Sequence, residues 1–123
     1  MTRAVILFGH GSRDPLWRRP MDAVAERLSR LQPGLSVRCA FLELTEPTLE
    51  RVADELALAG VSAVAILPMF LGAGRHVRED LPTLVDALRQ RHPDMLWDLR
   101  PPVGEDPRLL DHLADLALRA AGP

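Results

Sequence analysis

The sequence contains no tyrosine and a single cysteine, and aromatic residues make up only 4% of the chain. So few aromatic side chains disfavour an RNA-binding surface built on base stacking. The one cysteine, Cys39, cannot form a disulfide within the chain and fits a reducing compartment, so we expect a cytoplasmic protein. An excess of basic residues is also missing, because the formal net charge is -2 at pH 7. We therefore expect no nucleic-acid partner and no acidic membrane surface as a partner.

Long hydrophobic runs are absent as well. The opening run "AVILF" (4–8) stops at a glycine, which makes it too short for the apolar part of a signal peptide or for a membrane span. Hydrophobic residues nonetheless amount to 47% of the 123 residues, which is enough for the core of one domain over 1–123.

Short apolar runs alternate with stretches of helical periodicity along the whole chain. The apolar runs predict strands at 4–8, 35–43, 61–71 and 95–99. The periodic stretches predict helices at 21–31, 45–60, 77–91 and 107–120. In the second helix we expect Pro47 in the first turn and Gly60 as the C-terminal cap.

This alternation predicts a three-layer α/β/α sandwich, in which helices cover both faces of a four-stranded parallel sheet through right-handed crossovers. The first and third strands are apolar throughout, which is typical of strands buried on both faces, so we place them at the centre. The resulting flavodoxin-like strand order is 2-1-3-4. In that order the chain reverses direction between strands 1 and 3, which opens a crevice at their C-terminal ends.

Two histidines are expected at this crevice. His10 follows the first strand directly, and His76 lies in the loop that leaves the third strand. Two neutral imidazoles facing a cleft suit a borderline divalent metal such as Co²⁺, Ni²⁺, Fe²⁺ or Zn²⁺. Because two ligands hold a metal loosely, the pattern favours delivery of a metal over a permanently bound metal cofactor.

The loops around these histidines carry further candidate residues. Glu43, at the end of the second strand, is placed to add an oxygen ligand or a proton acceptor. Ser12 and Arg13, together with free N–H groups of the following helix, predict an anion-binding corner. The residues expected to give a large ligand room or to extend this corner are Gly11, Gly72, Gly74, Arg75, Arg78 and Arg100.

Four stretches of the chain resemble successive blocks of the small sirohydrochlorin chelatases of the CbiX type, which are class II tetrapyrrole chelatases. They are "VILFGHGSRDP", "AFLELTEPTL", "ILPMFLGAGRHVREDLP" and "PPVGEDPRL". The resemblance implies an enzyme that inserts a divalent metal, Co²⁺ or otherwise Fe²⁺ or Ni²⁺, into sirohydrochlorin for cobalamin or sirohaem biosynthesis. It implies that His10 and His76 bind the metal and assist pyrrole deprotonation, and that Glu43 is the family's acidic residue. Since larger chelatases resemble two such domains fused, it also implies a homodimer.

Two other functions use the same residues. A non-catalytic carrier of metal or tetrapyrrole would need the same histidines and anion corner, and turnover separates it from a chelatase. A strand that ends in His-Gly is also found in histidine phosphatases, in which the imidazole is phosphorylated. Those enzymes place an arginine just before the histidine, where this chain has Gly9.

Overall fold

Strands and helices alternate in the computed structural model, which describes residues 2–123. The strands are β1 (Arg3–Gly9), β2 (Ser36–Phe41), β3 (Ala63–Pro68) and β4 (Leu96–Leu99). The helices are α1 (Arg19–Leu31), α2 (Leu49–Leu58), α3 (Arg75–Arg91) and α4 (Pro107–Ala120), with a 3-10 turn, η1 (Val103–Glu105), before α4. The predicted order of elements is therefore confirmed.

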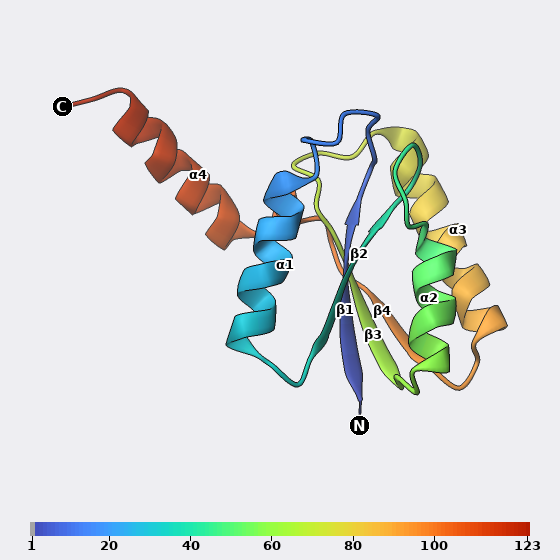
Figure 1. The fold of residues 1–123 in the computed structure, drawn as a ribbon. Helices are drawn as coiled ribbons and strands as arrows, with labels where there is room; N and C mark the ends of the chain where they lie inside the picture. Colours follow the sequence, from blue (N-terminus) through green and yellow to red (C-terminus); the bar gives the residue numbers. More distant parts are fainter. Residues whose placement is uncertain (1) are drawn as a thin grey trace.

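The strands form one sheet in the order β2-β1-β3-β4, and every pairing in it is parallel. Figure 1 shows α1 on one face of this sheet and α2 with α3 on the other face. The predicted sandwich and its strand order are confirmed. The order also places the chain reversal between β1 and β3, as the sequence predicted.

The central strand β1 is buried on both faces. Ile6 and Phe8 are fully enclosed against residues of α2 and α3 that include Val52 and Val85. Leu7 points to the opposite face and packs with Met21 of α1, because successive side chains alternate across a strand. Full burial of such a side chain stabilises the fold by about 1.5–3 kcal/mol. The core therefore fixes the position of the residues that follow β1.

The boundaries of α2 differ in part from the prediction. The placement of Pro47 in its first turn is wrong, because Thr48 is the N-cap and Pro47 precedes it. The Thr48 side chain accepts a hydrogen bond from the Arg51 N–H at 3.2 Å, which satisfies a free donor of the first turn. The role of Gly60 is confirmed, since it follows the C-cap with a φ of 80°.

The strands that lead to the crevice are shorter than expected. β2 ends at Phe41 and β3 ends at Pro68, so Glu43 lies in a loop rather than at the end of a strand. The expected loop position of His76 is wrong, because α3 begins at Arg75 and His76 is its second residue. The helix starts this early because its N-cap is Gly74, the last residue of the glycine-containing turn.

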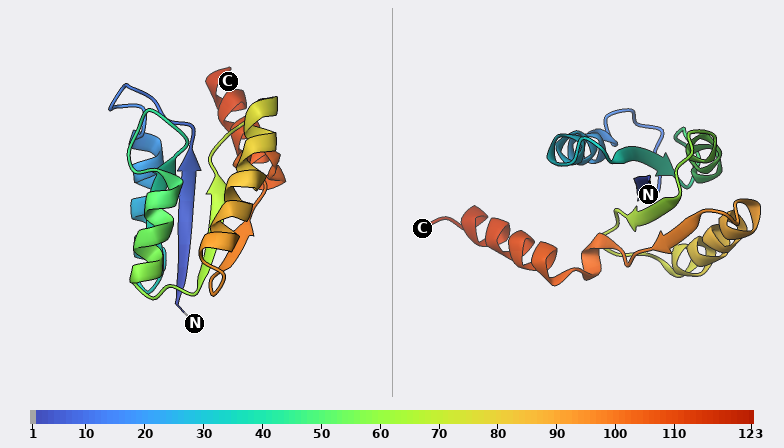
Figure 2. Two further views of the ribbon diagram at one scale, coloured as in Figure 1. Left: turned by 90° about the vertical axis from the view of Figure 1, so that its right-hand side faces the viewer. Right: turned by 90° about the horizontal axis from the view of Figure 1, so that it is seen from below.

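The last helix stands apart from the rest of the fold. Figure 2 shows α4 projecting away from the sheet on the side of α1, and none of its residues is buried. Its contacts with other elements are mainly with η1. Within residues 2–123, no helix combines the length and the apolar character that a membrane span requires.

Candidate functional site

Loops that follow β1, β2 and β3 meet at the C-terminal edge of the sheet (Figure 1). Backbone hydrogen bonds hold them in place on both sides of β1. The Glu43 N–H donates to the His10 carbonyl at 3.0 Å, and the Met69 N–H donates to the Phe8 carbonyl at 2.8 Å. The parallel pairing of the strands therefore extends into the loops and fixes where His10 emerges.

The structure brings His10 and Glu43 together. Nε2 of His10 lies 3.0 Å from Oε1 of Glu43, and the two side chains are 49% and 56% exposed. When the carboxylate is ionised it accepts a hydrogen bond, so Nε2 carries the hydrogen and Nδ1 presents a free lone pair. The pair is thus an oriented imidazole with one nitrogen available to a metal or a proton.

Gly11 determines how closely the loop after β1 can approach the loop after β2. Its φ is 108°, a conformation that side-chain-bearing residues rarely adopt, and a Cβ built on it would lie 1.6 Å from the Glu43 carbonyl oxygen. This glycine makes room for the protein's own backbone, whereas the sequence predicted that it makes room for a ligand. Gly72 and Gly74 differ, because a Cβ on either would meet no atom within 4 Å.

Thr45 joins the loops after β1 and β2, a role that was not predicted from the sequence. Its Oγ1 accepts a hydrogen bond from the Ser12 N–H at 2.9 Å and donates one to the Ser12 carbonyl at 2.7 Å. The available signal was its place in "LTEPT", which the periodicity assigned to the start of a helix. A hydroxyl that satisfies both backbone groups of one residue holds that residue firmly.

The sequence predicted an anion-binding corner made by Ser12, Arg13 and free N–H groups of the following helix, but two N–H groups that follow Ser12 already have partners within the loop. The Asp14 N–H donates to Ser12 Oγ at 3.1 Å, and the Leu16 N–H donates to an Asp14 carboxylate oxygen at 2.9 Å. The helix α1 begins only at Arg19. Among the described residues Arg13 has no carboxylate partner, so its guanidinium is the group of this loop that remains available to an anion.

His76 lies on the other side of the crevice, exposed on the first turn of α3. Its neighbour Arg75 forms an ion pair with Glu79 at 2.9 Å within the same helix. Within residues 2–123, no hydrogen bond or ion pair joins His76 to His10 or Glu43, and no three His, Cys, Asp or Glu side chains converge closely enough to hold a metal ion. The three predicted residues therefore surround one edge of the sheet without forming a closed metal site.

Cys39 is not a ligand candidate in this structure. It is half-buried and packs beside the core formed by Leu7, Met21 and Phe41. Burial raises the pKa of its thiol, with a smaller contribution from the Asp22 carboxylate. A protonated thiol is a poor metal ligand, so Cys39 is a packing residue, as the strand alternation predicted.

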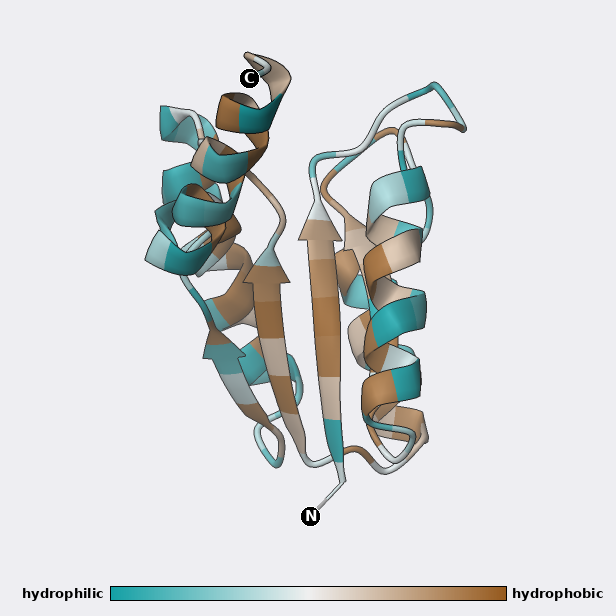
Figure 3. Cartoon of the chain, turned by 90° about the vertical axis from the view of Figure 1, so that its left-hand side faces the viewer, coloured by the Kyte–Doolittle hydropathy of each residue, from teal (hydrophilic) through white to brown (hydrophobic). Residues whose placement is uncertain are grey.

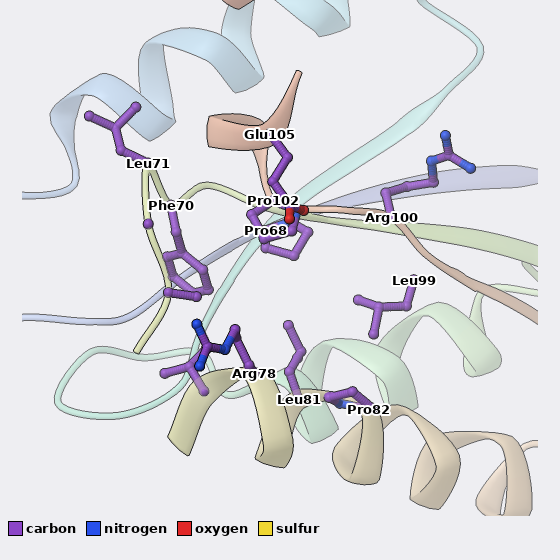
Figure 4. Close-up of a pocket in the computed structure, with 13 residues that line it drawn as sticks. Pro68, Phe70, Leu71, Arg78, Leu81, Pro82, Leu99, Arg100, Pro102 and Glu105 are labelled. Carbon is purple, nitrogen blue, oxygen red and sulfur yellow. The ribbon is translucent and has the colours of Figure 1, made fainter. Parts of the chain in front are cut away.

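A cavity of about 400 Å³ lies between the first turns of α3 and η1 (Figure 4). Its walls are mainly apolar and include Phe70 and Leu81, while Arg78, Arg100 and Glu105 supply charge. The full lining is Pro68, Phe70, Leu71, Gly72, Ala73, Val77, Arg78, Leu81, Pro82, Leu99, Arg100, Pro102 and Glu105. An apolar cavity with two arginines suits a flat organic ligand that carries carboxylates.

Comparison with known proteins identifies the family. The CbiX family model matches residues 4–120. A sirohydrochlorin cobaltochelatase of Methanopyrus kandleri is 35% identical over 82 residues, which cover 67% of this chain and 57% of the relative. The matched segments span 57% to 62% of the length of the first curated relatives.

Two solved structures share the fold. One, from Marinobacter aquaeolei VT8, is assigned to the CbiX proteins of cobalamin (vitamin B12) biosynthesis. It has a TM-score of 0.84 and 30% identity, and the match covers 97% of this chain and 97% of that chain. The other is the sirohydrochlorin chelatase SirB from Bacillus subtilis subspecies spizizenii in complex with cobalt. It has a TM-score of 0.75 and 27% identity, with 86% of this chain and 45% of that chain covered.

Proposed function

We propose that the chain is a sirohydrochlorin chelatase, starting from the fact that it belongs to the CbiX family. The reaction exchanges two pyrrole protons of sirohydrochlorin for one divalent metal ion, in cobalamin or sirohaem biosynthesis. The observation that carries the proposal is the His10–Glu43 pair, joined at 3.0 Å at the C-terminal edge of the sheet. Ligands of open α/β folds bind at this edge, beside the point where the chain reverses direction.

His10 is the proton acceptor in this proposal. With Nε2–H donated to Glu43, the free Nδ1 accepts a proton from a pyrrole N–H or holds the incoming metal, at different stages of the reaction. The Glu43 carboxylate stabilises the imidazolium that forms. Because both side chains are about half exposed, the proton then passes to water.

His76 presents the metal from the opposite side of the crevice. Its imidazole is exposed on the first turn of α3 and is free of the His10–Glu43 pair. A metal held only by His10, in the loop after β1, and by His76, on α3, is bound weakly, which fits an ion that passes through as a substrate and is not kept as a cofactor. Co²⁺ is the proposed ion, in line with the cobaltochelatase relative and the cobalt complex of SirB, and Fe²⁺ and Ni²⁺ are the alternatives.

The tetrapyrrole is bound through its carboxylate arms. Sirohydrochlorin is a wide apolar ring with eight carboxylates, so its site needs open space surrounded by cationic and hydroxyl groups. Arg13, in the loop after β1, and Arg100, which follows β4 and lines the cavity, are proposed to bind carboxylates. The remaining residues proposed to line the substrate site are Gly11, Ser12, Gly72, Gly74, Arg75 and Arg78.

The chain is proposed to act as a homodimer, with the tetrapyrrole cleft between or beside the paired domains. The match with SirB covers 45% of that protein, which leaves it room for a second domain of similar size. A homodimer of this chain would have two such domains, the number that fits within the length of SirB. We also propose a cytoplasmic location, because a single cysteine fits a reducing compartment.

Turnover tests the proposal. Purified protein is mixed anaerobically with an excess of sirohydrochlorin and with Co²⁺, Fe²⁺ or Ni²⁺ in turn, and the absorbance of the macrocycle is followed. We expect conversion of many equivalents per protein molecule, faster than the uncatalysed reaction. Binding that saturates at one equivalent without acceleration would instead identify a carrier, and no acceleration with any of the three metals would overturn the assignment.

A further inference from the structure

Leu44 has a backbone conformation that leucine rarely adopts. Its φ is 63°, and it is the one residue other than glycine with a positive φ among residues 2–123. In this left-handed region the Cβ crowds the following carbonyl oxygen, so glycine or asparagine is usual there and a bulky side chain is an outlier. Such an outlier persists where the surrounding structure enforces it, and outliers of this kind cluster at functional sites.

The turn at Leu44 is fixed by anchors on both sides of it. The Glu43 N–H donates to the His10 carbonyl at 3.0 Å, and Thr45 Oγ1 forms hydrogen bonds with both backbone groups of Ser12. The chain has to turn between these anchors, and the Thr45 N–H closes the turn by donating to the Glu43 carbonyl at 2.7 Å. The anchors explain the positive φ, but a glycine would satisfy them as well as a leucine.

Packing does not explain the leucine either. Leu44 is 55% exposed and belongs to neither of the two core clusters, whereas Leu42 packs against the larger one. The side chain therefore keeps about half of its apolar surface in water, although its backbone conformation is strained. A side chain that is unfavourable in the free protein on both counts indicates a contact that is made when a ligand binds.

Other loops at the same edge of the sheet also carry exposed leucines. Leu16, in the loop after β1, is 55% exposed, and Leu71, after β3, is 68% exposed. Because β1 lies between β2 and β3, Leu44 and Leu71 follow the strands on either side of the strand that leads to His10. Figure 3 shows apolar stretches among polar ones in the loops beyond the strand ends. The edge that carries the His10–Glu43 pair therefore offers apolar groups as well as polar ones to a ligand.

We infer that Leu44 is a contact residue for the flat, apolar face of the tetrapyrrole. This contact depends on the proposed function and adds to it a residue that binds the ring itself rather than its carboxylate arms. Leu44 directly follows Glu43, so a wide ring whose pyrrole nitrogens approach His10 reaches it. The ring face then covers the exposed half of the leucine, which stabilises the complex and not the free protein.

Titration of metal-free sirohydrochlorin into the protein, followed by the absorbance of the macrocycle, tests this contact. Leu44→Asn keeps a residue that tolerates a positive φ but removes the apolar side chain, whereas Leu44→Met retains an apolar side chain of similar volume. Leu58→Asn is the matched control, since Leu58 is a 90% exposed leucine at the last residue of α2, at the opposite edge of the sheet. Metal insertion kinetics, thermal unfolding and sedimentation equilibrium are measured on the same proteins.

We expect Leu44→Asn to raise the Kd of sirohydrochlorin about 5- to 10-fold, which is the effect of removing the burial of half a leucine. The KM for metal insertion should rise by a similar factor while kcat changes little, because the ring contact is present in both the ground state and the transition state. The Tm of Leu44→Asn should be no lower than that of the wild type, because asparagine relieves the left-handed strain. Leu44→Met and Leu58→Asn should keep the wild-type Kd and KM.

A Leu44→Asn variant with the wild-type Kd and KM would overturn the ring contact and leave the chelatase assignment intact. A Tm lowered by more than about 5 °C in this variant would identify Leu44 as a packing residue and also overturn the contact. A weakened dimer with an unchanged Kd for sirohydrochlorin would assign Leu44 to a subunit interface instead. A wild-type protein that neither binds sirohydrochlorin nor accelerates metal insertion would overturn the proposed function and the ring contact together.

Discussion

Substitution of Gly11 by alanine should disrupt the proposed catalytic pair without touching either of its side chains. The new Cβ would lie 1.6 Å from the Glu43 carbonyl oxygen, and real Cβ contacts essentially never fall below 3.0 Å, so the two loops must separate by at least 1.4 Å. The φ of 108° adds a conformational cost of about 1–3 kcal/mol for a residue with a side chain. The separation also breaks the hydrogen bond between His10 and Glu43.

A displacement of about 1 Å at a reacting group lowers a rate by up to about 100-fold. We therefore expect Gly11→Ala to reduce the initial rate of Co²⁺ insertion by about 100-fold and the free energy of unfolding by about 1–3 kcal/mol. The measurements are the macrocycle absorbance assay and denaturation in urea.

Gly34→Ala serves as the control, because a Cβ on Gly34 meets no atom within 4 Å and the residue lies between α1 and β2, away from the crevice. It should change neither quantity appreciably. If Gly11→Ala keeps the wild-type rate and stability, the loops are not held as described and the reasoning fails.

Three further substitutions test single interactions. Glu43→Gln keeps a side chain that can hydrogen-bond His10 but removes the charge that stabilises the His10 imidazolium. The kcat for metal insertion should therefore fall about 10-fold or more, while the circular dichroism spectrum stays unchanged. Thr45→Val removes both hydrogen bonds to the Ser12 backbone, and urea denaturation should show a loss of about 1–3 kcal/mol. The Arg108 guanidinium and N–H lower the pKa of Asp106 from an ordinary value of 3.8 to about 2, so its charge stabilises α4 above about pH 4 and loses this effect as the pH falls toward 2. Asp106→Asn keeps the helix cap, and its lower thermal stability at pH 7 should shrink to a small difference at pH 2.

The arrangement of the sheet was predictable because it follows from general rules. A continuous apolar run such as 4–8 has to be buried on both faces, which places β1 in the centre, and alternation with helices then leaves few possible strand orders. The same rules brought His10 to the correct edge of the sheet. The helix 107–120 was also located correctly, since its bounds depend on a local pattern.

The contacts between loops were not predictable in the same way. The pairing of Thr45 with Ser12 depends on the path of a loop that contains Leu44 with a positive φ of 63°, and no periodic pattern encodes that path. The predicted position of His76 was wrong because the helix was started at Val77, its first periodic apolar residue, whereas Gly74 already caps α3. The direction of α4 was also beyond sequence reasoning, because an amphipathic pattern indicates that a face needs a partner but not which chain supplies it.

The central claim is that His10 takes part in metal insertion, and its removal tests the claim most directly. The measurement is the initial anaerobic rate of Co²⁺ insertion by His10→Ala, compared with the wild type and with His92→Asn. His92 is the C-cap of α3 at the opposite edge of the sheet, where it contacts Asp54 at 2.8 Å. We expect His10→Ala to lose about 100-fold or more of the rate and His92→Asn to retain it. A His10→Ala variant that folds normally and inserts cobalt at the wild-type rate would contradict the proposed mechanism.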